Sequence, residues 1–591
     1  MTAAAAQAAV AAAGLGKRFR RKTGEVVVAL DDVSFTTRSG TLTAIVGPDG
    51  AGKTTLLRLM CGLMKAEAGT LSVIGRDVAA TPQEVQDRIG YMPQKFGLYE
   101  DLTVQENLDL YADLHGVNPH ERRSVYPGLM DMTQLGPFVD RLAGKLSGGM
   151  KQKLGLACTL VRSPELLLLD EPTVGVDPLS RRELWDIVLK LVRDDGLTVI
   201  LTTSYLDEAE RCDHAVLMNA GRVLAQGRPE EITAKAEGRT FMATPPPGMP
   251  ARSLQARLFE LPTIVDAVPE AGKVRVVLAS SDHAQALTVE GRSIHTEPVR
   301  PTFEDGFMVL FRPAAGERLP HRMVLDRPLA GDTGQIAVEV HDLTKTFGDF
   351  TAVNHVSFQV RKGEIYGLLG PNGAGKSTTF RMLCGLLPAS GGTLHVAGAD
   401  LRVSRAEARQ RLGYVAQKFS LYGQLSVNEN LEFFASAYGL RGARKRHRIE
   451  WARRQFELDR FADLPSSQLP GGFKQRLAMA AALLHEPEIL FLDEATSGAD
   501  PMARREFWGR ITSLSEQGVT VIVTTHFMDE AEYCDRVIIL DSGRRLAEGT
   551  PAEIRAHAQD VAGHEPTMED AFIAIVQESR ARDTDEGRNA A

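Results

Sequence analysis

Two stretches of the chain place glycines, a lysine and a hydroxyl residue in a spacing that binds phosphate. "GPDGAGKT" (47–54) and "GPNGAGKS" (370–377) both read G-x-x-x-x-G-K-[ST]. The glycines let backbone N–H groups surround phosphate oxygens, the lysine reaches the β- and γ-phosphates, and the hydroxyl is placed on Mg²⁺. Each stretch follows an apolar segment, "TLTAIV" or "IYGLL", and precedes a helical pattern, which is the context of a P-loop.

The sequence therefore predicts two sites for ATP and Mg²⁺. Lys53 and Lys376 would contact the phosphates, and Thr54 and Ser377 would contact the metal. The expected phosphate-binding residues are Gly47, Pro48, Asp49, Gly50, Ala51, Gly52, Lys53, Thr54 and Thr55, and Gly370, Pro371, Asn372, Gly373, Ala374, Gly375, Lys376, Ser377 and Thr378.

Acidic pairs follow apolar runs in "LLLLDEP" (166–172) and "ILFLDEA" (489–495). We expect Asp170 and Asp493 to hold Mg²⁺, directly or through water, and Glu171 and Glu494 to polarise an attacking water. One such pair is often only the end of a strand. Two pairs, each 117 residues after a P-loop lysine, indicate a functional site.

These residues belong to a duplicated unit. "YMPQKFGLY" (91–99) recurs as "YVAQKFSLY" (414–422), and "KLSGGMKQK" (145–153) as "QLPGGFKQR" (468–476). The separation is 323 residues from the P-loop lysines through Asp177 and Asp500. "AVAAAGLGKRF" (9–19) matches "AVEVHDLTKTF" (337–347), so the alanine-rich start is predicted to contain a strand and not a signal peptide.

Both copies end alike, with "PTFEDGF" (301–307) and "PTMEDAF" (566–572), but copy one carries about 58 extra residues before that ending. The extra segment combines strand-like "RTFMAT" and "KVRVVLA" with the helix-period "ARSLQARLFE", so we expect an α+β appendage. The predicted organisation is an α/β protein with one domain over 7–237, the appendage over 238–311, a linker over 312–335, a second domain over 336–575 and a disordered tail over 576–591.

Composition excludes several classes of function. A net charge of −8 and a pI near 6.0 give no electrostatic footprint for nucleic acid. No apolar run approaches the roughly 18 residues of a membrane span. The five cysteines form no C-x-x-C, which argues against a metal or disulfide framework and fits a reducing cytosol.

The ordered motifs closely resemble those of ABC-transporter nucleotide-binding domains: the P-loop, Gln94 or Gln417, "LSGGM", "DEP", "GVDP" and a closing His526. The tandem arrangement and the "PT-x-ED-x-F" closures resemble the fused ATP-binding subunit of bacterial ABC-2-type multidrug exporters. The resemblance implies a cytoplasmic ATPase, peripheral on the inner membrane, which drives separate integral-membrane permease subunits of the ABC-2 type.

The resemblance also implies roles for further residues. Gln94 and Gln417 would touch Mg²⁺ and sense the permease, and the apolar stretch after each would receive a permease helix or else be core. Phe19 and Phe347 would stack on adenine, unless each is a core aromatic. Asp177 and Asp500 would bridge the halves. The residues expected to complete the opposite ATP site are Ser147, Gly148 and Gly149 in one half and Gly471 and Gly472 in the other.

Two departures fall together if the halves pair head-to-tail within one chain, as the resemblance implies. "TTSYLDEAE" (202–210) has Ser204 where "TTHFMDEAE" (524–532) has His526, and "LPGGF" has Pro470 where "LSGGM" has Ser147. Ser204 and Pro470 would share one composite site, predicted to bind ATP and turn it over slowly. The alternative is tolerated drift, with Pro470 only starting its helix.

Two other classes are weighed against the exporter. A tandem ABC ATPase acting on ribosomes would also have two halves and no membrane span, but a long charged helical arm would join its halves. The appendage and the Pro-rich linker do not resemble such an arm. A DNA-repair ABC ATPase would need zinc-type cysteine clusters, which the sequence lacks.

Overall fold

The computed structural model describes residues 8–20, 26–95, 97–280, 287–314, 323–326, 334–417, 421–497, 499–558 and 566–589. The chain divides into two compact units, each treated by itself below. The first comprises residues 1–241, 277–284 and 298–317, and the second comprises 242–276, 285–297 and 318–591.

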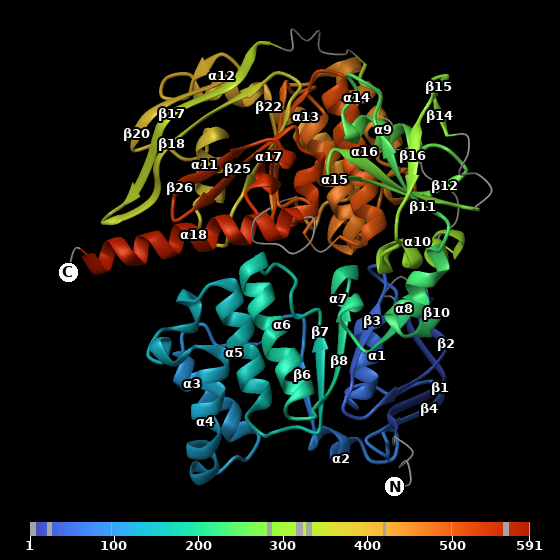
Figure 1. Cartoon of the computed structure of the whole chain (residues 1–591). Helices are drawn as coiled ribbons and strands as arrows, with labels where there is room; N and C mark the ends of the chain where they lie inside the picture. The colour runs from blue at the N-terminus through green and yellow to red at the C-terminus, as the bar shows by residue number, and fades with distance from the viewer. Residues whose placement is uncertain are drawn as a thin grey trace. The chain divides into compact units, whose positions relative to one another are not determined.

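The first unit is built on a six-stranded sheet of order β10-β9-β3-β8-β7-β6, and Figure 1 shows β3, β7 and β8 together. All neighbours are parallel except β9 and β10. Every residue of β3, β7 and β8 is buried, as expected for parallel strands covered on both faces. A second sheet, of order β2-β1-β4-β5, is antiparallel.

The strands of the first unit are β1 (Ala8–Arg20), β2 (Val26–Arg38), β3 (Leu42–Val46), β4 (Ala68–Val73), β5 (Arg76–Asp77), β6 (Ile89–Met92), β7 (Leu166–Asp170), β8 (Thr198–Thr203), β9 (His214–Asn219) and β10 (Arg222–Gly227). The helices are α1 (Lys53–Met60), α2 (Pro82–Gln86), α3 (Val104–Leu114), α4 (Pro119–Thr133), α5 (Gly148–Leu160), α6 (Pro178–Arg193), α7 (Leu206–Glu210), α8 (Pro229–Thr233) and α10 (Phe303–Ala314), with the 3-10 turns η1 (Gly136–Phe138), η2 (Ala143–Lys145) and η3 (Ala234–Ala236).

The second unit repeats both sheets, as β22-β23-β24-β19-β25-β26 and β18-β17-β20-β21. The strands are β12 (Ile264–Glu270), β14 (Thr288–Val289), β15 (Arg292–Ser293), β17 (Ile336–Phe347), β18 (Phe350–Arg361), β19 (Ile365–Leu369), β20 (Gly391–Val396), β21 (Ala399–Asp400), β22 (Leu412–Val415), β23 (Ile489–Asp493), β24 (Thr520–Thr524), β25 (Arg536–Asp541) and β26 (Arg544–Gly549). The helices are α9 (Ala251–Phe259), α11 (Lys376–Leu383), α12 (Arg405–Gln410), α13 (Val427–Ala437), α14 (Gly442–Gln455), α15 (Gly471–Leu483), α16 (Pro501–Glu516), α17 (Pro551–Ala556) and α18 (Met568–Asn589), with the 3-10 turns η5 (Asp459–Phe461), η6 (Ser466–Gln468) and η7 (Met528–Tyr533).

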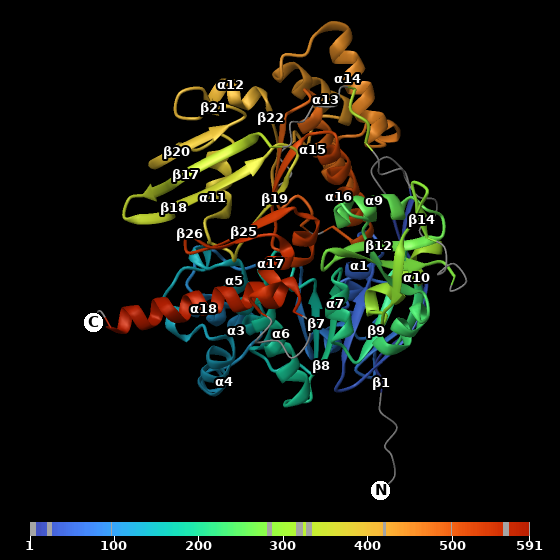
Figure 2. The same cartoon turned by 45° about the horizontal axis from the view of Figure 1, so that its top comes forward.

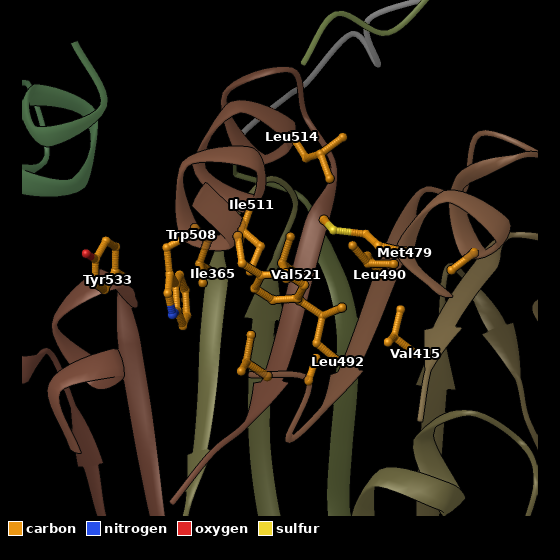
Figure 3. Close-up of a cluster of buried hydrophobic side chains, with 14 of the residues drawn as sticks. Ile365, Val415, Met479, Leu490, Leu492, Trp508, Ile511, Leu514, Val521 and Tyr533 are labelled. Atoms are coloured by element: carbon orange, nitrogen blue, oxygen red, sulfur yellow. The ribbon is translucent and has the colours of Figure 1, made fainter. Parts of the chain in front are cut away.

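The core of the second unit lies between this sheet and the helices α15 and α16. Figure 3 shows Leu490, Leu492 and Val521 of the strands facing Met479 and Ile511 of the helices. The ring of Trp508 stacks on that of Tyr533, with the centroids 4.7 Å apart. This packing fixes α16 and η7 against each other, and both elements adjoin the site described below.

The predicted appendage has its expected elements, completed by β11 (Thr240–Thr244), β13 (Lys273–Leu278) and β16 (His295–Pro298) in a sheet of order β12-β13-β11-β16. Its helix α9 packs on α16, as Figure 2 shows. The pair of Asp266 with Arg505 is buried, while the pair of Arg257 with Glu516 is partly exposed. The segment 242–276 is therefore part of the second unit although it follows the first domain in sequence.

The predicted boundary of the appendage at 311 is wrong, because α10 belongs to the first unit. Phe303 and Phe307 are buried, and the helix packs on α7, α8 and η3. The approach is close enough that a Cβ on Gly306 would lie 2.1 Å from the carbonyl oxygen of Ile232. The shared "PT-x-ED-x-F" ending thus closes its own domain, as α18 does in the second unit.

The structure also describes parts of the predicted tail and of the predicted linker. Residues 576–589, predicted to be disordered, continue helix α18, the long red helix of Figure 1, and Arg580 forks onto Asp541. Within the predicted linker, the described residues 323–326 lie against the second unit, where Met323 is buried and Arg448 donates to Asp326 at 2.7 Å.

Candidate nucleotide-binding and catalytic site

The two P-loops fold alike, between a central strand and the first helix of each large sheet. The ammonium of Lys53 donates to the carbonyl oxygen of Gly47 at 2.6 Å, and Lys376 donates to that of Gly370 at 2.6 Å. Lys53 also lies 3.2 Å from a carboxylate oxygen of Glu171. Both lysines are nearly fully buried, with their ammonium groups held by carbonyl oxygens of the loop.

A glycine is required where each loop turns into its helix. Gly52 and Gly375 have φ values of 102° and 93°, in the left-handed region that other residues avoid. A Cβ on Gly52 would lie 2.5 Å from the carbonyl oxygen of Ala29, and one on Gly375 would lie 2.5 Å from that of Ala352. The backbone conformation of each loop therefore requires glycine at this position.

The predicted acidic residues lie at the carboxyl ends of β7 and β23, beside the P-loops. The hydroxyl of Thr54 donates to Asp170 at 3.1 Å. Burial, the largest influence, raises the pKa of Asp493, although a hydrogen bond from the Thr524 hydroxyl at 2.6 Å opposes it. A buried carboxylate next to a P-loop hydroxyl is the oxygen donor set that Mg²⁺ prefers, so these residues fit the metal.

Each candidate base is held from several sides. Glu171 and Glu494 have positive φ values of 50° and 46°, a strained backbone for residues other than glycine. The side-chain amide of Gln94 donates to Glu171 at 2.6 Å, and that of Gln417 to Glu494 at 2.5 Å. The structure thus brings the predicted glutamine of each unit onto the predicted base.

The units differ at the residue that follows β8 and β24. The Nδ1 of His526 lies 3.4 Å from a carboxylate oxygen of Glu494, while its Nε2 is buried without a hydrogen-bond partner among the described residues. Ser204, also buried, has no hydrogen-bond partner for its hydroxyl within the described part of the chain. Burial alone would raise the pKa of Glu494, but His526, Lys376 and Gln417 outweigh it and lower this pKa. In the second unit, therefore, the carboxylate of Glu494 is ionised and lies beside the imidazole of His526.

The other predicted residues occupy helix starts or exposed strand ends. Ser147 caps α5 by accepting from the N–H of Met150 at 3.2 Å, whereas Pro470 stands at the start of α15 without a side-chain cap. Phe19 and Phe347 are 37% and 50% exposed, which excludes the core-aromatic alternative for both.

The predicted bridging residues Asp177 and Asp500 cap the helices α6 and α16. The glycines of the first signature stretch, Gly148 and Gly149, begin α5, and Gly471 and Gly472 begin α15.

Sequence reasoning missed the threonines that hold the acidic pairs. The hydroxyl of Thr202 donates to Asp170 at 2.7 Å and accepts from the N–H of Glu171 at 3.0 Å. Thr524 makes the same two contacts in the second unit, at 2.6 and 3.0 Å. The repeated "TT" before Ser204 and His526 is the signal that could have revealed them.

Comparison with known proteins agrees with this geometry. The family model described as "ABC transporter" matches residues 30–174 and again 353–497. The chain is 50% identical over 571 residues to the "Probable multidrug ABC transporter ATP-binding protein YbhF" of Escherichia coli (strain K12), covering 96% of this chain and 97% of that protein. The chain belongs to the ABC transporter family.

Another relative in this family, the "Nod factor export ATP-binding protein I" of Ralstonia nicotianae, is 42% identical over 231 residues, which are 39% of this chain and 71% of that protein. The ABC transporter match confirms the predicted fold class of two tandem P-loop domains and makes the chain an ATP-binding, ATP-hydrolysing subunit that acts with membrane partners. None of the helices in the described ranges has the length and apolar character that a membrane crossing requires.

Proposed function

We propose that the chain is the ATPase of a multidrug exporter and drives separate ABC-2-type permease subunits from the cytoplasmic face of the inner membrane. The support is the 50% identity, over nearly the whole length of both chains, to a protein named as a probable multidrug transporter subunit. A second relative is also named as an export protein. Nothing among these relatives supports the ribosome alternative.

ATP would bind on each P-loop, with Lys53 and Lys376 turning from the loop carbonyls to the β- and γ-phosphates. Mg²⁺ would be held by Thr54 or Ser377 with the aspartate of the same unit, and when bound it offsets the charge of the phosphates. Phe19 and Phe347 are exposed strand-end rings able to stack on adenine.

Hydrolysis would depend mainly on Glu494. This carboxylate accepts a proton from water as the water oxygen attacks the γ-phosphorus; the bond to the bridging oxygen breaks, leaving ADP and phosphate. The lowered pKa of Glu494 keeps it ionised, and its hydrogen bond from Gln417 fixes its direction. His526 would direct its unpartnered Nε2 at the γ-phosphate.

The first unit would bind ATP with the same cradle but turn it over slowly. Its base, Glu171, has the same backbone and glutamine contact as Glu494. Ser204 is too short to place a donor where an imidazole nitrogen would be. We further propose that the halves pair within one chain, so that Pro470 completes this site and Ser147 completes the other.

The test is a comparison of matched substitutions. Glu494→Gln should lower steady-state ATPase by about 10²-fold or more, the usual scale for a general base, while Glu171→Gln should leave it within a few-fold. The kinetic effects of residues that act as a unit are not additive. In a chain that carries both Ser204→His and Pro470→Ser, Glu171→Gln should therefore lower the ATPase rate strongly. Equal losses from the two glutamine variants would show that the sites are equivalent and would overturn the proposed asymmetry.

A further inference from the structure

One arginine of the second unit contacts both the loop before α16 and the loop that carries His526. Arg504 lies in the first turn of α16, after the capping Asp500. Its Nη2 donates to the carbonyl oxygen of Ala499 at 3.4 Å, and its guanidinium carbon lies 4.4 Å from the centroid of the Phe527 ring. The side chain is only 11% exposed, so these contacts are largely shielded from water.

The same guanidinium faces a buried acid on η7. Its Nε lies 3.8 Å from an oxygen of Glu530, which is 1% exposed and has no hydrogen bond to that oxygen in the described part of the chain. The other oxygen of Glu530 accepts from the hydroxyl of Thr525 at 2.6 Å, and the Thr525 hydroxyl accepts from the N–H of Phe527 at 2.9 Å. The residues on both sides of His526 are therefore held by one connected set of contacts.

We propose that Arg504 is a positioning residue that fixes the imidazole of His526 against Glu494. It acts from one side through the ring of Phe527, whose centroid is 4.3 Å from that of His526, and from the other through Glu530. The inference rests on the proposed roles of His526 and Glu494. Because the His526–Glu494 contact is already 3.4 Å long, a small shift of the loop would break it.

Cation–π contact and charge pairing are strongest where water is excluded, as it is here. A positively charged, planar group can lie over a ring and face a carboxylate at the same time, which an ammonium group cannot reproduce. Removing it would take the guanidinium away from both the Phe527 ring and the carboxylate of Glu530. The consequence is a displaced imidazole, with the P-loop itself unchanged.

The first unit supplies the matched control. Arg181, at the equivalent position, lies 5.7 Å from the Tyr205 ring and pairs with Asp207 at 3.2 Å. There the buried acid is Glu208, whose second oxygen accepts from the indole N–H of Trp185 at 3.1 Å. The indole N–H of Trp508, the counterpart of Trp185, has no hydrogen-bond partner among the described residues. Within the described residues, the buried acid of the second unit therefore has one oxygen that accepts no hydrogen bond and faces the arginine.

The experiment uses the full chain with Mg²⁺ and compares R504A, R504K and R181A. We expect R504A to lower kcat by about tenfold or more, since small misplacements of catalytic groups are this costly, with KM for ATP nearly unchanged. Equilibrium binding of a non-hydrolysable ATP analogue should stay at two per chain with similar affinity. R504K should recover part of the loss because it keeps the charge, and R181A should leave kcat within about twofold.

A double-mutant cycle with H526A separates positioning from general loss of structure. R504A should cost little more once His526 is absent, because both changes remove the same contact. If R504A does not fold, F527L tests the ring side alone and should lower kcat in the same direction. Unchanged kcat in R504A, or a full additional loss in the H526A background, would overturn the proposal. Unchanged kcat in both E494Q and H526A would instead overturn the proposed function.

Discussion

Breaking the buried ion pair between Asp266 and Arg505 should destabilise the second unit. Arg505 reaches both carboxylate oxygens, with its Nε at 3.3 Å and its Nη2 at 3.4 Å, and the two side chains are 3% and 5% exposed. Removing one partner of such a pair leaves a charge in a site with little water. The cost is about 3–5 kcal/mol, more than the pair itself contributes to folding.

We therefore expect Asp266→Asn to destabilise the second unit by about 3–5 kcal/mol, which lowers its Tm by on the order of 5–10 °C. Two of the three tryptophans, Trp451 and Trp508, lie in this unit, so thermal melts followed by tryptophan fluorescence report mainly on it. Glu290→Gln is the matched control, because Glu290 is 62% exposed in its pair with Arg257 and should cost less than about 1 kcal/mol.

The reasoning fails if the Tm of the Asp266→Asn variant equals that of the Glu290→Gln control. It also fails if replacing Asp266 and Arg505 together costs as much as the sum of the two single changes. In a coupled pair the second removal costs less than the first, because the contact between the two side chains is already broken. Such additivity would mean that the appendage contacts α16 without stabilising it through this pair.

Two further predictions concern nucleotide binding and pH. Lys53→Ala and Lys376→Ala should each remove one of two bound ATP molecules in equilibrium binding, and two molecules retained by either variant would refute the P-loop assignment. Burial raises the pKa of Glu532 to about 7, even though Arg555 lies 2.9 Å away. Glu532 thus favours the folded state fully below about pH 4.5 and loses this effect as pH rises through about 7. Denaturant titrations across this range should show a weaker pH dependence for Glu532→Gln, and an unchanged slope would contradict the assigned burial.

The P-loops and acidic pairs were predictable from sequence because local rules determine them. A glycine-rich turn between an apolar strand and a helix fixes its own backbone, and parallel strands bring their carboxyl ends to one edge. Lys53 and Asp170 are therefore neighbours in any fold that keeps these elements. The contact of Gln94 with Glu171 follows for the same reason, since β6 and β7 are adjacent and parallel.

The docking of the appendage could not be read from its own pattern. Its strands and helix were evident, but Arg252 finds Ser515 and Arg257 finds Glu516 only after both segments fold. The first domain has Val192 and Arg193 in the matching "KLVRDDG" segment, where these arginines would meet an apolar side chain and a like charge. This difference favours packing of the appendage on the second unit. It can be recognised only once the positions of Arg252 and Arg257 in the fold are known.

The C-terminal part of helix α18 lies where the sequence analysis predicted a disordered tail. The run "QESRARDTDEGRN" is charged and nearly free of apolar residues, which is typical of disorder. Glutamate and arginine are nevertheless good helix formers, and Glu578 pairs with Arg582 one turn later. The further pair of Arg580 with Asp541 of β25 ties the helix to the sheet, a contact with no local signal.

The two units agree more closely in the residues proposed for ATP binding than in those proposed for hydrolysis. The lysine contacts, the threonine hydroxyls and even the positive φ of Glu171 and Glu494 agree between them. They differ in the residue over the base and in how the acid behind it, Glu208 or Glu530, is satisfied. The arginine of the first unit pairs with Asp207, while that of the second unit faces the buried Glu530. The difference over the base and the difference around the acid behind it therefore occur together, as expected if the first unit is retained for ATP binding and not for rapid turnover.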